Sequence, residues 1–337
     1  MSSISLCMRP KAAPLEWDEF CATHEPYGIA LDGYVVAGSR FNPAGPHLNL
    51  DHHTEVDRLA TRATCAQTLL AIRQGLFECF RDGHGPRAQA CVNDCDEDIC
   101  TAWFLLTHAD LAAPGKMPRL DGLVSLVDVL DTTAGAYPLP ADLSSLKELA
   151  WVFAPYHGFR RSGELDRREP EGHRGVVDEV SCRIERHLSG RGSSYPLDGR
   201  YERRGGGPGW TLIREVGAQA RLGAVADGIR AYVAVRERPD GRWAYVVGRM
   251  SPFAPFDVPS ILQSLNEAEG PGGDGWGGSN LVGGSPRVRG STLPPDEVER
   301  IINKQLQASR VTHGAGDTKG SRAAGRPRAA TCGVPVT

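Results

Sequence analysis

The sequence lacks the features of several common protein classes. No run approaches the roughly 20 consecutive apolar residues of a membrane-spanning helix. Residues 1–17 do not combine a basic start with an apolar core, so no signal peptide is expected. The Walker A, Rossmann and HExxH motifs are also absent, which removes the common nucleotide-binding and zinc-protease assignments.

The chain also lacks a strong net charge and any CxxC pair. Its 38 basic and 41 acidic residues give a net charge of −3, so no overall field points to nucleic acid or a membrane as partner. The nine cysteines fit reduced thiols in a cytoplasmic protein better than a disulfide framework.

The length of 337 residues allows two domains. Strand and helix patterns alternate over residues 28–188, which predicts an α/β domain with a mostly parallel sheet flanked by helices. Residues 189–209 are rich in Gly, Ser and Arg and predict a linker. Residues 210–307 predict a second, smaller α+β domain. We expect residues 1–27 to be an N-terminal extension and residues 308–337 a disordered tail.

Hydrophobic periodicity predicts the individual elements. Apolar residues that recur every four positions indicate helices, and alternating apolar residues indicate half-buried strands. Residues 155–163 are expected to form a surface loop that carries His157. The predicted strands are 28–38, 46–50, 88–93, 229–236 and 243–247, and the predicted helices are 61–80, 99–108, 120–130, 175–188, 255–269 and 294–306.

Two predicted strands end in residues that can bind metal. Strand 46–50 runs into Asp51, His52 and His53, which offer a hard oxygen ligand and two nitrogen ligands to a divalent cation. The alternative is a histidine pair on a solvated strand end.

Strand 88–93 runs into three alternating carboxylates, Asp94, Asp96 and Asp98. Three carboxylates in a confined loop need a counter-charge, which a divalent cation would supply. The alternative is an acidic surface turn in which Asp98 caps the next helix. Sites in parallel sheets lie at the carboxyl ends of the strands, which favours the metal interpretation for both motifs. Asp32 interrupts an apolar strand and needs a metal, hydrogen bonds or a tight turn with Gly33, and we favour the turn.

These motifs resemble those of the DHH family of phosphoesterases, in which the triplet ends an apolar strand and precedes a helix of small residues, here 63–67. Residues 93–98 are similar to the family's DxD motif, which binds a pair of manganese ions. Residues 131–137 are similar to a later family pattern that begins with an aspartate. The resemblance implies two Mn²⁺ or Mg²⁺ ions, with His52 or His53 as a ligand or assisting the leaving group. The implied metal ligands are Asp51, His52, Asp94, Asp96 and Asp131.

The glycine-rich stretch of the second domain is similar to the family's GGH loop, which holds substrate against the metals. Here the loop would be Gly283, Gly284 and Ser285, with Ser285 in place of the histidine, and Arg287 and Arg289 would add charged donors to a phosphate. The alternative is a flexible glycine-rich connection.

The resemblance has two departures. In the family the DxD motif precedes the DHH triplet, whereas here it follows, and Asn93 stands where the family has a histidine. We therefore carry two hypotheses. The first is a cytoplasmic, manganese-dependent phosphohydrolase acting on a phosphoester or phosphoanhydride bond of a nucleotide, a short oligonucleotide or polyphosphate, with a homodimer left open. The second is a degenerate relative that binds a nucleotide or a protein partner without hydrolysis.

Overall fold

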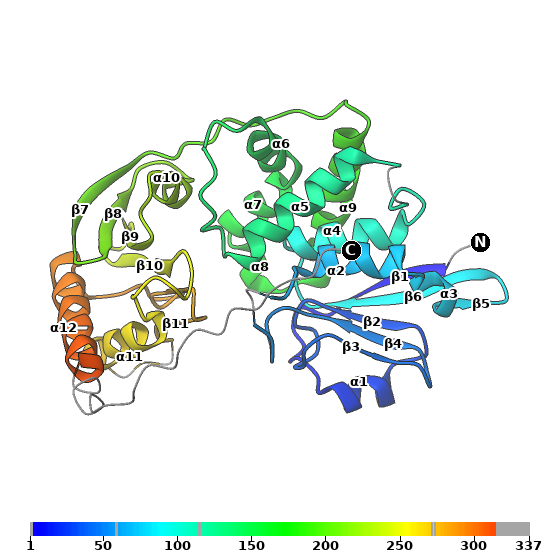
Figure 1. Ribbon diagram of the computed structural model, residues 1–337, viewed down its shortest axis with the longest axis horizontal. Coiled ribbons are helices and arrows are strands. Elements are labelled where there is room, and N and C mark those ends of the chain that lie inside the picture. Colours follow the sequence, from blue (N-terminus) through cyan, green and yellow to red (C-terminus); the bar gives the residue numbers. More distant parts are fainter. Residues whose placement is uncertain (1–2, 58–59, 114–115, 271, 273, 315–337) are drawn as a thin grey trace, which may run out of the picture.

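A computed structural model describes residues 3–57, 60–113, 116–270, 272 and 274–314. The chain forms two domains that lie side by side (Figure 1), each built on one mixed β-sheet. Residues 315–337 of the predicted tail lie outside the described residues, whereas residues 308–314 continue the last helix.

The sheet of the first domain has a parallel centre and antiparallel edges. Its strands run in the order β1-β6-β2-β4-β3, and the pairs β1–β6, β6–β2 and β2–β4 are parallel. The pairs β3–β4 and β5–β6 are antiparallel, so the sheet is mixed and not the mostly parallel sheet that was predicted. The strands are β1 (Ser3–Met8), β2 (Gly28–Leu31), β3 (Arg40–Asn42), β4 (His47–Leu50), β5 (Arg81–Asp82) and β6 (Gly85–Val92).

Strand β1 belongs to this sheet, so the expected N-terminal extension is wrong over residues 3–8. It pairs with β6 from Ser3 opposite Arg87 to Met8 opposite Val92. Ile4, Leu6 and Met8 pack against the main core of the domain, whereas Cys7 packs on the other face of the sheet. This alternation is the mark of a strand with two covered faces.

Helices cover both faces of the first sheet. The largest core cluster joins the sheet to α2, α4, α5 and α9, and a smaller one joins the opposite face to α1. The helices are α1 (Trp17–Thr23), α2 (Thr64–Arg73), α3 (Leu76–Cys79), α4 (Glu97–Thr107), α5 (Pro118–Thr132), α6 (Ser144–Val152), α7 (Ala154–Arg161), α8 (Glu164–Arg167) and α9 (Pro170–Leu188).

Left-handed backbone positions shorten two predicted elements. The predicted strand 28–38 ends at Leu31, because Asp32 (φ 51°) and Gly33 (φ 77°) turn the chain away from the sheet. The predicted helix 61–80 is divided into α2 and α3 by Gly75, whose φ is 94°. The predicted loop 155–163 is wrong, since α7 forms there with Pro155 in its first turn, where proline is tolerated.

The sheet of the second domain has the order β11-β12-β10-β9-β8-β7 and is antiparallel except for β8–β9. Helices α11 and α12 pack on one face and α10 on the other. The elements are β7 (Tyr201–Gly207), β8 (Trp210–Glu215), α10 (Ala220–Ala226), β9 (Ala231–Glu237), β10 (Trp243–Arg249), α11 (Val258–Glu269), β11 (Gly277–Gly278), β12 (Val282–Gly284) and α12 (Pro295–Gly314).

Strand β7 lies inside the predicted linker 189–209, so the linker reaches only to residue 200. Its glycines allow close approach of α12, because a Cβ on Gly207 would lie 2.0 Å from Oδ1 of Asn303. Glycine content that predicted a flexible linker therefore serves tight packing of a helix on a strand.

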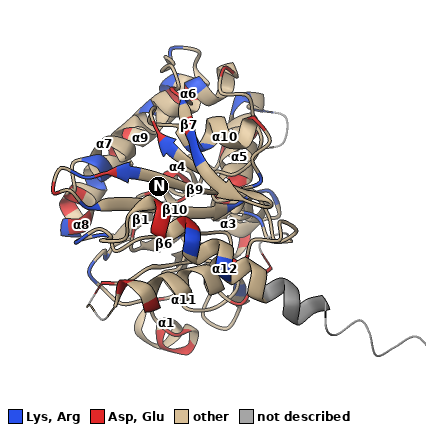
Figure 2. Ribbon diagram, turned by 90° about the vertical axis from the view of Figure 1, so that its left-hand side faces the viewer, with Lys and Arg blue, Asp and Glu red and all other residues tan. Residues whose placement is uncertain are grey.

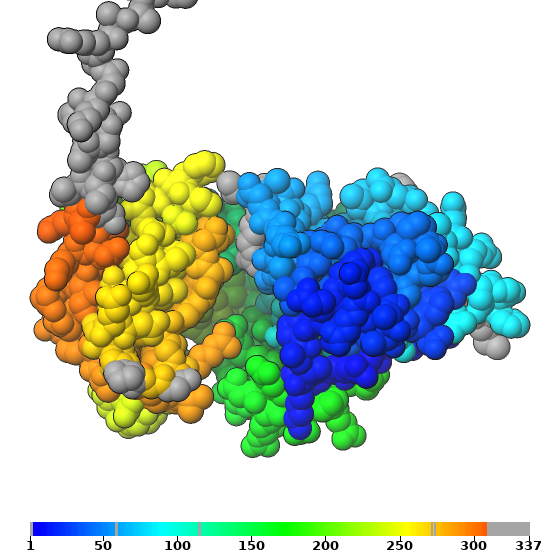
Figure 3. Space-filling model, turned by 90° about the horizontal axis from the view of Figure 1, so that it is seen from below, coloured from blue at the N-terminus to red at the C-terminus, as the bar shows by residue number. Residues whose placement is uncertain are grey.

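The carboxyl ends of the central strands of the first sheet face the second domain. The N-terminus and the β5–β6 hairpin lie at the far end of the first sheet in Figure 1, so β1 and β6 run toward the second domain. Figure 3 shows a hollow between the two domains on this side. Basic and acidic positions are intermixed over the ribbon in Figure 2, in line with the small net charge.

Candidate metal centre

Three strand ends bring the candidate residues to one edge of the first sheet. Asp32 follows β2, the triplet Asp51, His52 and His53 follows β4, and residues 93–98 follow β6. Strand β2 lies between β6 and β4 and runs parallel to both, so the three ends meet. The reversed order of the two motifs along the chain therefore does not prevent them from meeting in space.

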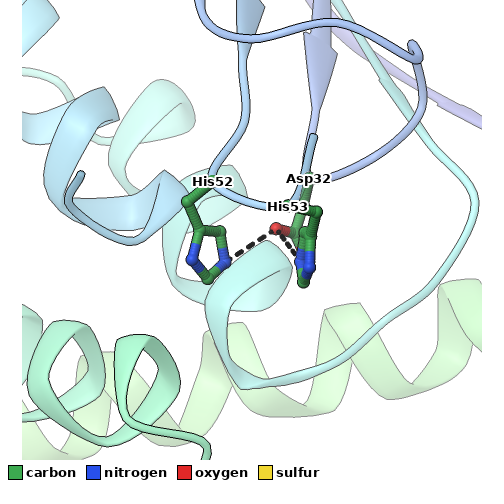
Figure 4. A group of neighbouring side chains, drawn as sticks. All are labelled: Asp32, His52 and His53. Carbon is green, nitrogen blue, oxygen red and sulfur yellow. Dashed lines mark hydrogen bonds and ion pairs between the residues drawn. The ribbon is translucent and has the colours of Figure 1, made fainter. Parts of the chain in front are cut away.

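His52 lies at the centre of a group of ionisable side chains. Its imidazole is buried, and Nε2 lies 2.7 Å from Oδ2 of Asp131, 3.2 Å from Oδ1 of Asp32 and 3.7 Å from Oδ2 of Asp98. His53 donates from Nε2 to the same Oδ1 of Asp32 at 3.0 Å (Figure 4). We call Asp32, His52, His53, Asp98 and Asp131 the His52 cluster.

Burial and mutual repulsion shift the ionisation of this cluster. Burial, reinforced by Asp32 and Asp131, raises the pKa of Asp98 to about 7. Burial works against a charged His52, but Asp131 and Asp32 outweigh it and raise the pKa of His52 to about 10. Burial likewise works against a charged Asp32, yet His52 and His53 hold the pKa of its carboxyl well below the usual range. The cluster has more acids than histidines to neutralise them.

The residues of the His52 cluster fit a divalent cation. Within the described part of the chain, Nε2 of His52 and Oδ2 of Asp131 are buried and have no hydrogen-bond partner of proper alignment, although they lie 2.7 Å apart. Buried polar atoms in folded proteins nearly always have a partner. Carboxylate oxygens and imidazole nitrogens are ligands that Mn²⁺, Mg²⁺ and Zn²⁺ accept to different degrees.

A second group of ligand atoms follows β6. One carboxylate oxygen of Asp94, Sγ of Cys95 and one ring nitrogen of His173 lie within 4.8 Å of one another. His173 comes from α9, is buried, and donates from Nδ1 to the carbonyl of Glu169 at 2.9 Å. We call Asp94, Cys95 and His173 the thiol site.

Asp96 in the β6–α4 turn and Asp98 in the first turn of α4 each cap a helix, in roles that the sequence did not predict. Helix α4 begins at Glu97, and Asp96 is its cap, with Oδ1 accepting from the backbone N–H of Ile99 at 2.9 Å. The prediction that Asp98 caps this helix is therefore wrong. Asp98 instead accepts from the backbone N–H groups of Thr64 and Cys65, at 2.7 Å each, and so caps α2.

The predicted metal ligands do not form one group in the structure. His52 and Asp131 lie in the His52 cluster, and Asp94 lies in the thiol site. Asp96 is half-buried within electrostatic reach of Asp32, Asp94, Asp131 and Asp98, and loss of hydration is the main reason that its pKa is raised well above the usual value. Asp51 lies in neither group. Its Oδ2 accepts from the backbone N–H groups of His53 and Thr54 and closes the turn after β4.

Four residues of the two groups, Asp32, Asp98, Cys95 and His173, were not among the predicted ligands. Asp98 was expected to be either a third ligand of the acidic motif or only a helix cap, and Asp32 was expected to form a tight turn. Asp32 does form the turn. In addition, its carboxylate accepts hydrogen bonds from His53 and from the hydroxyl of Thr64, and it forms an ion pair with His52. His173 carries no motif, since only the packing of α9 brings it to Asp94.

The predicted substrate loop is built differently from a flexible anion-binding loop. Gly283 and Gly284 lie in β12 and pair with Val247 and Val246 of β10. Ser285 is buried, and its Oγ accepts from the backbone N–H of Tyr245 at 3.0 Å.

The two arginines that follow β12 differ in their surroundings. Arg289 donates from Nε to the carbonyl of Asp274 at 3.1 Å, so its guanidinium is part of the loop's own structure. Arg287 is exposed, and the orange segment that follows β12 projects into the hollow between the domains in Figure 3. His157, expected in a loop, lies on α7 with Nε2 2.9 Å from Oε1 of Glu97.

No family model matches this sequence, and no curated protein matches it. The likeness to DHH phosphoesterases therefore depends on the motifs quoted above and on the site that they form. In the described part of the chain, no helix is both long enough and apolar enough to cross a membrane.

Proposed function

We propose that the protein is a metal-dependent phosphohydrolase that cleaves a phosphoester or phosphoanhydride bond in a nucleotide, a short oligonucleotide or polyphosphate. The observation that supports this most is the buried pair of His52 Nε2 and Asp131 Oδ2, which lie 2.7 Å apart without an aligned hydrogen bond inside a cluster of carboxylates and imidazoles. Mn²⁺ or Mg²⁺ is the cation we expect there, and a cytoplasmic location and a homodimer stay predictions.

Divalent cations in such a centre polarise phosphate oxygens and lower the pKa of bound water. The chain's own residues would bind the cation, orient the substrate and move a proton. His53 is suited to the last role, because its side chain is 42% exposed while Nε2 is held by Asp32. An imidazole in that position can carry a proton to a leaving oxygen near neutral pH.

The position of the cluster supports a small phosphorylated substrate. The cluster lies at the edge of the first sheet that faces the second domain, and the second domain carries an exposed cation, Arg287, that we expect to contact a phosphate. The small net charge and the intermixed basic and acidic positions along the ribbon favour a small anion over long nucleic acid.

Hydrolysis by full-length protein, stripped with a chelator and reloaded with Mn²⁺ or Mg²⁺, tests the proposal. The substrates are nucleotides, dinucleotides and polyphosphate, and the readout is phosphate or nucleotide release. Asp131→Asn keeps the shape of the side chain but removes its charge, and we expect turnover to fall at least about 100-fold. Asp121→Asn on the same helix is the control, because Asp121 pairs with Arg73 away from the cluster.

Two outcomes would count against the proposal. Equal turnover in the Asp131 and Asp121 variants would remove the His52 cluster from the reaction. An inert wild-type protein that still binds a nucleotide, measured by calorimetry, would favour the degenerate binding protein instead.

A further inference from the structure

The thiol site differs in ligand chemistry from the His52 cluster. It offers a sulfur, a nitrogen and an oxygen, whereas the His52 cluster offers only oxygens and nitrogens. Cys95 lies in the turn between β6 and α4, and His173 lies in α9. Both side chains are buried, at 0% and 1% exposure. The two residues are distant in sequence and meet only in the folded protein.

Hydrogen bonds orient Asp94 and His173 and leave one possible ligand atom of each side chain for a cation. Nδ1 of His173 is occupied by the carbonyl of Glu169, which leaves Nε2 as the nitrogen available to a cation. A second hydrogen bond of this kind usually accompanies a metal-bound imidazole. Oδ1 of Asp94 accepts from the backbone N–H of Cys95 at 2.7 Å, which leaves its other oxygen. The Cys95 carbonyl accepts from Sγ of Cys100, which helps to fix the turn.

We infer that Asp94, Cys95 and His173 form a binding site for a borderline-soft divalent cation such as Zn²⁺. Zinc accepts thiolate, imidazole and carboxylate together, whereas Mn²⁺ and Mg²⁺ favour oxygen ligands. Three protein ligands leave one tetrahedral position open to water or substrate. The inference does not rest on the proposed function, because the thiol site shares no residue with the His52 cluster.

Binding would convert the Cys95 thiol to a metal-bound thiolate and release its proton to solvent. Burial, with added repulsion from Asp94 and Asp96, raises the pKa of Cys95. Because the Cys95 side chain is fully buried, its sulfur is not open to a substrate as a free nucleophile, even though a histidine and a carboxylate lie beside it.

Cobalt titration of the full-length, chelator-stripped protein tests the inference, because Co²⁺ reports a thiolate ligand by a charge-transfer absorption in the near ultraviolet. We expect this absorption in the wild type, its loss in Cys95→Ser, and at least about tenfold weaker Co²⁺ binding in His173→Gln. Cys91→Ala is the matched control, because Cys91 is equally buried on β6 but packs on the opposite face with Phe20 and Ala30. Its absorption should equal that of the wild type.

A wild-type protein that binds Co²⁺ without thiolate absorption would overturn the inference, and so would absorption that survives in Cys95→Ser. The wild-type titration decides this even if a variant folds poorly. Mn²⁺-dependent hydrolysis without the absorption would contradict the thiol site and support the proposed function. The absorption without hydrolysis of any substrate in the panel would support the thiol site and contradict the proposed function.

Discussion

Single carboxylates hold separate segments of this chain together by accepting several hydrogen bonds each. Asp98 of α4 accepts from two backbone N–H groups of α2. In the second domain, the Glu269 carboxylate accepts from Ser291 Oγ, from the backbone N–H of Thr292 at 2.8 Å and from Trp276 Nε1 at 3.1 Å. Hydrogen bonds to an ionised acceptor are stronger than those to a neutral one, so these carboxylates should matter to stability.

Glu269→Gln should lower the free energy of unfolding at neutral pH by about 1–2 kcal/mol. Burial acts to raise the pKa of Glu269, but its hydrogen bonds outweigh burial and hold the pKa below 4.5. The charged form therefore adds stability above pH 4.5 that is lost as the pH falls through the lower, folded-state pKa. Urea unfolding at pH 7 and at about pH 4 should show the deficit of the variant shrinking at the lower pH.

The exposed Glu267 lies on the same helix, so Glu267→Gln serves as the control and should change stability little at either pH. A Glu269→Gln deficit that stays constant with pH would show that the charge of Glu269 has no part in holding Ser291 and Thr292.

At the scale of elements, the β11–β12 hairpin shows why a glycine-rich stretch need not be a ligand-binding loop. A Cβ on Gly283 would lie 2.4 Å from Cδ1 of Leu262 on α11 and 2.9 Å from the carbonyl of Gly277. A Cβ on Gly277 would meet nothing within 4 Å. Gly283 is thus required by the close approach of α11 to the sheet.

Gly283→Ala should therefore destabilise the second domain by about 1–3 kcal/mol, the usual cost of adding a methyl group to a filled site. Thermal unfolding, with Gly277→Ala as the matched control, measures the difference. If Gly283→Ala instead left stability unchanged and weakened only phosphate binding, the loop would be an anion site as the motif first suggested.

At the scale of the whole molecule, the end of α5 links the metal centre to the second domain. Asp131 lies in the last turn of α5, and Ala136 follows after a turn in which Ala134 and Gly135 have positive φ. Ala136 is buried among Ile213, Ala224 and Val225 of the second domain. One short segment therefore joins a cluster ligand to the contact between the domains.

Ala136→Glu would place a charge in this apolar contact, and we expect the two domains to separate while each keeps its secondary structure. Small-angle scattering should show a larger radius of gyration, and a protease should cleave residues 189–200 faster than in the wild type. Tyr137→Glu, at a neighbouring exposed position, is the control. An unchanged radius in Ala136→Glu would mean that other contacts set the arrangement of the domains.

Local sequence determined the elements that have a strong hydrophobic periodicity or clear residues at their ends. Strand β9, the four-residue repeat of α9 and the DHH strand end were readable directly. The alternation in β9 predicted a half-buried strand, which is wrong, because α10 covers the face of Tyr232 and Ala234. Helix α7 was missed because Pro155 and Gly158 suggest a loop, although proline fits the first turn of a helix. Strand β1 was missed because its short alternation acquires meaning only beside β6.

The sequence by itself supplied the residues of the candidate centre, and the tertiary structure decided how they are grouped. His52 and Asp131 were expected to share a site, and they lie 2.7 Å apart. Whether a carboxylate binds a metal, caps a helix or closes a turn depends on which backbone N–H groups and which charges surround it. Asp51, Asp96 and Asp98 could not be separated by type or spacing, because the groups that surround them come from other elements. His173 reaches Asp94 only through the packing of α9, a long-range contact that leaves no local pattern in the sequence.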